Sequence, residues 1–169
     1  MDSATQIGLI LTAVGTIATI WGAIVATKQA KDAAKSATDA MRARNQIVNQ
    51  RRTSDLAELK VHCERAIRSM EKYGPAASPT SLIGISPTTD AHDVQKLILE
   101  ANRLNELFPK NEAELFVHRI SPLLVLFVSP AEQGRIPENG KAVLMEASTF
   151  LGVVKTNLDI KRETISREA

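Results

Sequence analysis

Residues 3–27 read SATQIGLILTAVGTIATIWGAIVAT, a stretch that contains no charged side chain. Its apolar core runs from Ile7 to Ala26. A helix rising about 1.5 Å per residue needs about 20 apolar residues to cross a hydrocarbon layer roughly 30 Å thick, and this core has that length. The hydroxyls of its threonines can bond back to helix carbonyls, so no polar group needs to be stranded in lipid. The stretch therefore predicts a transmembrane anchor over residues 1–27.

Two other interpretations fit a long apolar segment. A cleaved signal peptide has a basic leader, a shorter apolar core and a small-x-small cleavage site. Here the leader carries only Asp2, and the segment ends in Ile24-Val25-Ala26, which is a poor cleavage site. A buried core helix of a soluble domain usually keeps a polar face, which weakens that alternative. An anchor is the favoured interpretation.

Positive charge follows the apolar segment. Residues 28–52 hold seven Lys or Arg side chains against two Asp, and the N-terminal flank has no basic residue. The positive-inside rule then places the N-terminus outside and the remaining body in the cytoplasm. A single cysteine, Cys63, and the lack of an Asn-x-Ser/Thr sequence both fit a cytoplasmic body. We expect a single-pass protein of the inner (plasma) membrane.

Small residues recur along the apolar segment at spacings of three and four. They are Gly8, Thr12, Gly15, Thr19, Gly22 and Ala26. Such a heptad seam lets two membrane helices approach closely, so we expect it to be a self-association surface of a homo-oligomer. The alternative is that glycine is simply common in membrane helices.

Residues 28–55 predict a basic, alanine-rich helical stalk. Alanine is the strongest helix former, and no glycine or proline lies between Ala23 and Tyr73. An unbroken helix from about Thr5 to Tyr73 would be about 100 Å long. Alternatively, Thr53 and Ser54 could cap a new helix and interrupt the stalk.

The basic residues of the stalk fall into two groups by their distance from the apolar segment. The first group lies within about 14 Å of the segment's end and can bind anionic headgroups for roughly 1 kcal/mol each. It consists of Lys28, Lys31 and Lys35. Arg51 and Arg52 would lie about 38 Å away, several Debye lengths beyond the lipid surface. They are either solvated charges or part of a site for a small anionic ligand such as a nucleotide. The candidate ligand-binding residues are Arg42, Arg44, Arg51 and Arg52.

Residues 56–169 predict a cytoplasmic bundle of amphipathic helices. The first helix carries an apolar stripe at Leu56, Leu59, Cys63, Ile67 and Met70. Residues 74–89 hold three prolines and two glycines and predict a loop. Further helices are expected over about 90–108, from about 111 onward, and over about 141–167, with a polar turn region over 130–140.

The segment after Asn111 allows more than one structure. Asn111 and Glu114 have the spacing of a capping box. Pro122 either kinks this helix or begins another, with Ser121 as its cap. Leu123 to Val128 is a run of six apolar residues, which predicts the most buried part of the domain, with a core β-strand as the alternative.

The common short motifs of enzymes and metal sites are missing from the sequence. There is no phosphate-binding loop, dinucleotide fingerprint, His-Glu-x-x-His sequence or cysteine pair, so we expect no catalytic residues, no metal and no cofactor. Cys63 lies on an apolar stripe and is expected to be a core residue, with His62 pointing about 100° away from it.

Two polar groups remain as weaker site candidates. Asp90, His92 and Asp93 could offer metal ligands, but acidic residues at this place are expected to cap a helix. His118 and Arg119 are flanked by apolar residues and are expected to form a partly buried polar contact rather than a catalytic pair.

The sequence therefore predicts an all-α, non-enzymatic, single-pass membrane protein. Its helical body would oligomerise or dock a protein partner at the cytoplasmic membrane face. The alternative is a membrane-disrupting defence effector gated by an anionic, nucleotide-like ligand bound to its cytoplasmic domain. The expected partners are the lipid bilayer, further copies of the chain, and a protein or small anionic ligand. Duplex nucleic acid is not expected, because residues 73–169 carry ten basic against twelve acidic side chains.

Overall fold

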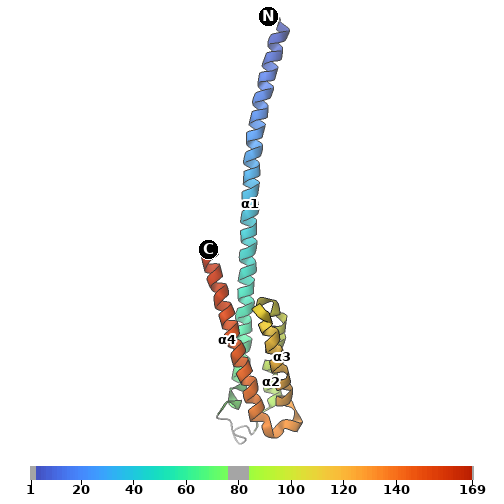
Figure 1. Cartoon of the computed structure of the whole chain (residues 1–169), viewed down its shortest axis with the longest axis vertical. Coiled ribbons are helices and arrows are strands. Elements are labelled where there is room, and N and C mark those ends of the chain that lie inside the picture. Colours follow the sequence, from blue (N-terminus) through green and yellow to red (C-terminus); the bar gives the residue numbers. More distant parts are fainter. Residues whose placement is uncertain (1–2, 76–83, 169) are drawn as a thin grey trace. The chain divides into compact units, whose positions relative to one another are not determined.

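The computed structural model describes the backbone of residues 3–75 and 84–168, and the side chains of these residues except 3–18, 20, 164 and 167–168. Within this part the chain is all-α, with four α-helices joined by short 3-10 turns and no β-strand, as the sequence predicts (Figure 1). The α-helices are α1 (Ser3–Met70), α2 (Pro87–Arg103), α3 (Glu112–Val128) and α4 (Ile136–Glu168). The turns are η1 (Glu71–Tyr73), η3 (Asn105–Leu107), η4 (Pro109–Asn111) and η5 (Pro130–Arg135).

The chain divides into two compact units, Met1–Ile47 and Val48–Ala169. All described residues of the first unit belong to α1. From Trp21 to Ile47 every side chain of this unit is exposed. No other element of the described chain belongs to this unit.

The second unit is a helical bundle around one hydrophobic core. α3 packs against both α2 and α4, and the final part of α1 contributes one wall of the core. The buried residues of α1 repeat every three or four positions, as expected for one helix face. They are Leu56, Leu59, Cys63, Ala66 and Met70. The predicted apolar stripe is thus confirmed, except that Ile67 is only partly buried and Ala66 takes its place.

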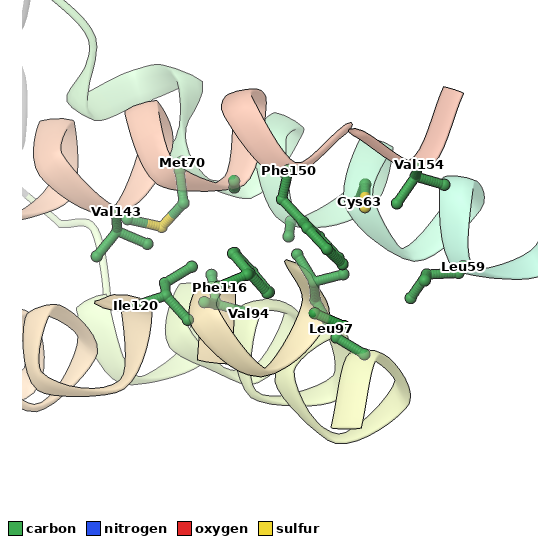
Figure 2. Packing of buried hydrophobic residues seen from close by; sticks show 14 of the residues in the cluster. Leu59, Cys63, Met70, Val94, Leu97, Phe116, Ile120, Val143, Phe150 and Val154 are labelled. Atoms are coloured by element: carbon green, nitrogen blue, oxygen red, sulfur yellow. The ribbon is translucent and has the colours of Figure 1, made fainter. Parts of the chain in front are cut away.

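Aromatic side chains fill the centre of this core. Phe116 of α3 stacks on Phe150 of α4 with their ring centroids 4.0 Å apart and their planes 3° from parallel. Figure 2 shows the two rings in the centre of the core, with Cys63 of α1 beside Phe150 and Val94 of α2 beside Phe116. Four helices therefore meet at one stacked pair, which fixes how α3 and α4 lie against each other.

The first helix continues where an interruption was considered. α1 runs through residues 51–54 without a break, and the Thr53 hydroxyl donates a 2.9 Å hydrogen bond to the carbonyl of Asn49. That hydroxyl therefore bonds back along the same helix and caps no new one. The alternative of a helix beginning near Thr53 is wrong.

One predicted helix start and one predicted capping bond are also wrong, although α3 begins directly after Asn111 as the sequence predicts. α2 begins at Pro87 rather than at Asp90, because proline suits the first turn, where its missing N–H is not needed. Asn111 precedes α3 in the left-handed conformation, with φ 55°, and its side chain makes no capping hydrogen bond. The predicted capping box is therefore absent at this described position.

The apolar run of residues 123–128 is helical and only partly buried. α3 passes through Pro122 without ending, and the Ser121 hydroxyl bonds the Val117 carbonyl at 2.6 Å instead of capping a new helix. A helix spreads six consecutive residues over all its faces, so the bundle covers only some of them. Val125 is 65% exposed. The prediction of the most buried segment is wrong, as is the alternative of a β-strand.

The connection after α3 is shorter than predicted. η5 ends at Arg135 and α4 begins at Ile136, so residues 136–140 are helical and not part of a turn. The helical start brings Gly140 against Tyr73: a Cβ atom at residue 140 would lie 2.6 Å from the Tyr73 Cβ and Cγ atoms. Only a glycine allows this close approach.

Among the described residues, no single helix is both long enough and apolar enough to cross a membrane. One pair of segments, Pro109–Val128 and Pro130–Glu163, meets the length and composition together, but the two are bent by 97°. For the expected anchor, the backbone is helical from Ser3, and the side chains of residues 7–18 and 20 lie outside those that the structure describes.

Candidate functional site

The most distinctive surface of the first unit is the part of α1 that follows the expected anchor. Its side chains are exposed all round, including large apolar ones: Met41 is 70% exposed and Ile47 is 66% exposed. A single helix in water gains little stability from its own hydrogen bonds, and most helices in proteins depend on packing of an apolar face. This part of α1 therefore presents a surface suited to a partner.

Charged and uncharged residues separate cleanly around this helix. When residues 28–43 are written in heptads abcdefg with Ala30 at position a, every charged residue falls at b, c or f. These residues are Lys28, Lys31, Asp32, Lys35, Asp39 and Arg42. We call this side the charged face.

The other four heptad positions hold uncharged residues, most of them small. Positions a and d are alanine throughout, at Ala30, Ala33, Ala37 and Ala40. The flanking e and g positions are Gln29, Ala34, Ser36, Met41 and Ala43. We call this side the alanine face. Because the side chains at positions a and d are single methyl groups, two such helices can approach each other closely.

The helix register divides the residues grouped as a ligand site into two pairs: Arg42 and Arg52 fall at positions f and b, whereas Arg44 and Arg51 both fall at position a. Arg42 lies on the charged face with Lys28, Lys31 and Lys35. Arg44, two residues later, points about 200° away and occupies the next a position of the alanine face. Arg51 and Arg52 belong to the second unit, are exposed, and point about 100° apart on the helix. The structure thus brings Arg42 together with the lysines and does not gather the four arginines into one site.

The small residues of the anchor are only partly described. Gly8, Thr12 and Gly15 lie outside the residues whose side chains the structure describes, whereas Thr19, Gly22 and Ala26 are exposed. A Cβ atom added at Gly22 would meet nothing within 4 Å.

In the second unit, a buried carboxylate joins α2 to the end of α1. Asp90 accepts a 2.6 Å hydrogen bond from the Tyr73 hydroxyl and a 2.7 Å bond from the Lys72 ammonium group. One turn along α2, Asp93 accepts a 2.6 Å bond from the Ser69 hydroxyl. The prediction that these acidic residues cap a helix is wrong, because Ser86 is the N-cap residue of α2 and both carboxylates bond residues of α1 and η1. Asp90 does lie in the first turn of α2, where the helix dipole favours an acidic residue.

The sequence pattern does not predict these hydrogen bonds between α2 and the end of α1. Tyr73 follows the apolar stripe of α1, so its burial can be predicted from the sequence. A buried tyrosine hydroxyl needs a hydrogen-bond partner, which predicts an acceptor nearby but does not identify it. Burial, followed by the hydrogen bond to Asp90, raises the pKa of Tyr73. The arrangement joins α2 to the turn that follows α1.

The other candidate chemical groups are structural or solvated. Cys63 is fully buried, and burial raises the pKa of its thiol to about 12, so it is protonated at neutral pH and a poor nucleophile. The prediction of a core cysteine is confirmed. His118 and Arg119 are both exposed, so the predicted partly buried contact is wrong for both side chains. Arg119 forms an ion pair with Glu146 at 3.2 Å. Among the described residues, no group of three potential metal ligands lies together.

A cavity of about 740 Å³ opens between Tyr73, the start of α2, the end of α3 and η5. Apolar side chains such as Ile85, Phe127 and Ile136 line it, and Thr88 and Gln133 are among its polar groups. None of its described lining residues is Asp, Glu, Lys, Arg or His.

No protein-family model, no curated protein and no solved structure matches this chain.

Proposed function

We propose that this protein is a non-enzymatic, membrane-anchored module that assembles with further copies of itself through the alanine face of α1. The observation that carries the proposal is the separation of charge on an otherwise unpacked helix. All charged residues from 28 to 43 lie on one side, and the opposite side is alanine-rich and exposed. Covering that side with the same side of another copy would stabilise the helix.

The membrane anchor of the proposal is residues 1–27, with the N-terminus outside and the bundle in the cytoplasm. It is supported by the length and lack of charge of Ile7 to Ala26 and by the basic residues that follow. In the heptad register of the alanine face, the small residues of the anchor fall at positions d and g. The same side of α1 would therefore contact further copies of the chain both within the bilayer and in the stalk that follows it.

In this proposal the bundle of the second unit docks a protein partner or spaces the assembly from the membrane. Its most reactive side chains are committed to packing: Cys63 is buried in the core, and Asp90 ties two helices together. A second function, membrane disruption gated by an anionic ligand, is favoured by one observation. Arg44 is the single charge on the alanine face among residues 28–47.

A pair of matched substitutions tests self-assembly. Full-length protein in mild detergent is compared with Ala40→Glu, on the alanine face, and Thr38→Glu, on the charged face. We expect light scattering to give an oligomer for the unchanged protein and for Thr38→Glu, and a monomer for Ala40→Glu, because only the latter buries like charges. Monomeric unchanged protein, or equal masses for both variants, would refute the proposal.

The anchor is tested separately by fractionation. The full-length chain is expected to stay in the membrane pellet after alkaline carbonate washing, whereas a chain beginning at residue 28 is expected in the supernatant. Full-length protein in the supernatant would contradict the anchor and leave the assembly test unaffected.

A further inference from the structure

We infer that Arg44 from each copy forms a ring of guanidinium groups that binds one multiply charged phosphate-type anion, and that more than two parallel copies make the ring. This inference rests on the proposed function, because it needs the alanine faces of several copies to meet. It differs from the four-arginine site that the sequence suggested, since Arg42 lies on the opposite side of the helix.

The width of the alanine face indicates more than two helices. In a two-stranded coiled coil only a and d are covered, and the e and g positions at the rim usually carry charges. Here all four positions are uncharged from residue 29 to residue 43, and Met41 at position e is large, apolar and exposed. A helix whose e and g flanks are both uncharged can pack on two neighbours, one on each side, and covering Met41 favours this arrangement.

The direction of the helices brings the arginines together. Chains anchored in one membrane at the same end emerge side by side in the same direction. Identical chains in register place each residue of the alanine face opposite the same residue of its neighbours. The Arg44 side chains therefore converge at one level of the assembly.

Nothing on the helix itself neutralises this charge. Three and four positions from Arg44 stand the uncharged residues Ala40, Met41, Ile47 and Val48. Among the described residues, no acidic side chain lies within ion-pair distance of Arg44. A covered cation without a counter-charge is unfavourable, and several of them repel one another. Phosphate-type anions suit such a ring because guanidinium groups bind their oxygens in pairs.

The ligand of this ring is a free anion and not a lipid headgroup. Arg44 follows Ala26, the end of the expected span, by 18 residues, which is about 27 Å of helix. The field of a charged surface falls off over about 8 Å at physiological salt. Lys28, by contrast, immediately follows the span and is suited to headgroups.

The test uses full-length protein in a non-ionic detergent, with inorganic tripolyphosphate as the probe and sodium chloride at matched ionic strength. Calorimetry measures binding, and light scattering measures the mass of the assembly. We expect one tripolyphosphate per assembly, a mass above that of a dimer, and at least tenfold weaker binding for Arg44→Leu. Arg42→Leu is the matched control, and we expect it to bind as the unchanged protein does. Adding phosphatidylglycerol to the micelles is expected not to displace the probe.

Each contrary result has a distinct meaning. An oligomer that binds tripolyphosphate equally well with Arg44→Leu, or loses binding equally with Arg42→Leu, overturns this inference and leaves self-assembly standing. Displacement by phosphatidylglycerol, or a dimeric mass, also overturns it. Protein that is monomeric with and without the probe refutes the proposed self-assembly, and the inference falls with it.

Discussion

The Tyr73 hydroxyl donates a 2.6 Å hydrogen bond to Oδ2 of Asp90, whose side chain is only 8% exposed. The other carboxylate oxygen accepts a 2.7 Å bond from Lys72. Both oxygens of a nearly buried carboxylate are thus paired, and both donors come from η1, directly after α1. The hydrogen bond between Tyr73 and Asp90 therefore holds α2 against the turn that follows α1. The two residues are 17 positions apart in the sequence, on either side of the connection between η1 and α2.

Removing this carboxylate should destabilise the bundle. Asp90→Ala leaves the buried Tyr73 hydroxyl without an acceptor, and we expect a loss of about 1.5–3 kcal/mol in the free energy of unfolding. Tyr73→Phe should cost about 1 kcal/mol. The protection of Cys63 against alkylation across a urea series is a suitable measurement, because this single thiol is buried in the bundle core.

The matched control for Asp90 is an ion pair on the surface of the same bundle. Lys60 and Glu64 lie 3.6 Å apart on α1 with both side chains about a third exposed. Lys60→Gln should change the free energy of unfolding by at most about 0.5 kcal/mol, because water screens such pairs. An Asp90→Ala variant as stable as Lys60→Gln would mean that the Tyr73 bond contributes nothing.

Replacing each of two glycines of α4 by alanine should change the free energy of unfolding in opposite directions. A Cβ atom at Gly140 would lie 2.6 Å from two carbon atoms of Tyr73, so Gly140→Ala forces a backbone shift and should cost about 1–3 kcal/mol. At Gly152 the added atom meets nothing within 4 Å, and Gly152→Ala should stabilise the helix by about 0.5–1 kcal/mol. Urea midpoints measured by Cys63 protection would show this contrast, and stabilisation by both would contradict the close approach to Tyr73.

Alkaline pH should weaken the bundle through Cys63. Burial raises the pKa of its thiol from 9.0 to about 12. The unfolded chain therefore releases this proton first, so stability is unaffected below about pH 9 and falls by about 1.4 kcal/mol per pH unit above it. The raised pKa of Tyr73 acts in the same direction from about pH 10.

The measurement compares urea midpoints, followed by circular dichroism, at pH 7, 9 and 10 for the unchanged protein and Cys63→Ala. The variant loses some packing, which lowers its midpoint at every pH, but it should lose the part of the pH dependence between pH 9 and 10 that Cys63 causes. Identical slopes for the two proteins would show that the thiol is not shielded from water.

The helices themselves could be read from the sequence, and their ends could not. The stripe from Leu56 to Met70 repeats every three or four residues, and such periodicity depends only on helix geometry. The start of α2 at Pro87 follows the preference of proline for the first helical turn, whereas the acidic residues predict a start three positions later, at Asp90. The partial exposure of residues 123–128 depends on how many neighbours a helix has, which a run of apolar letters does not reveal.

The candidate sites likewise include one feature that the sequence predicts and others that it does not. The separation of charge around residues 28–43 is a property of the sequence register, but Arg42 and Arg44 were grouped by residue type and not by their direction on the helix. The pairing of Tyr73 with Asp90 joins residues 17 positions apart across a loop, and no local pattern specifies it. Local periodicity therefore predicts faces, whereas contacts between helices must come from the fold.

Residues 125 and 127 give the sharpest test of how α3 lies in the bundle. Phe127 is 1% exposed, and its ring meets the Tyr73 ring edge to face at 4.9 Å, so Phe127→Ala should cost about 3–5 kcal/mol. Val125 points outward from the same run, and Val125→Ala should change the free energy of unfolding by no more than about 0.5 kcal/mol. Both are measured by Cys63 protection in urea. Similar losses for the two variants would require another protein surface to cover Val125, because a single bundle of this shape leaves it in water.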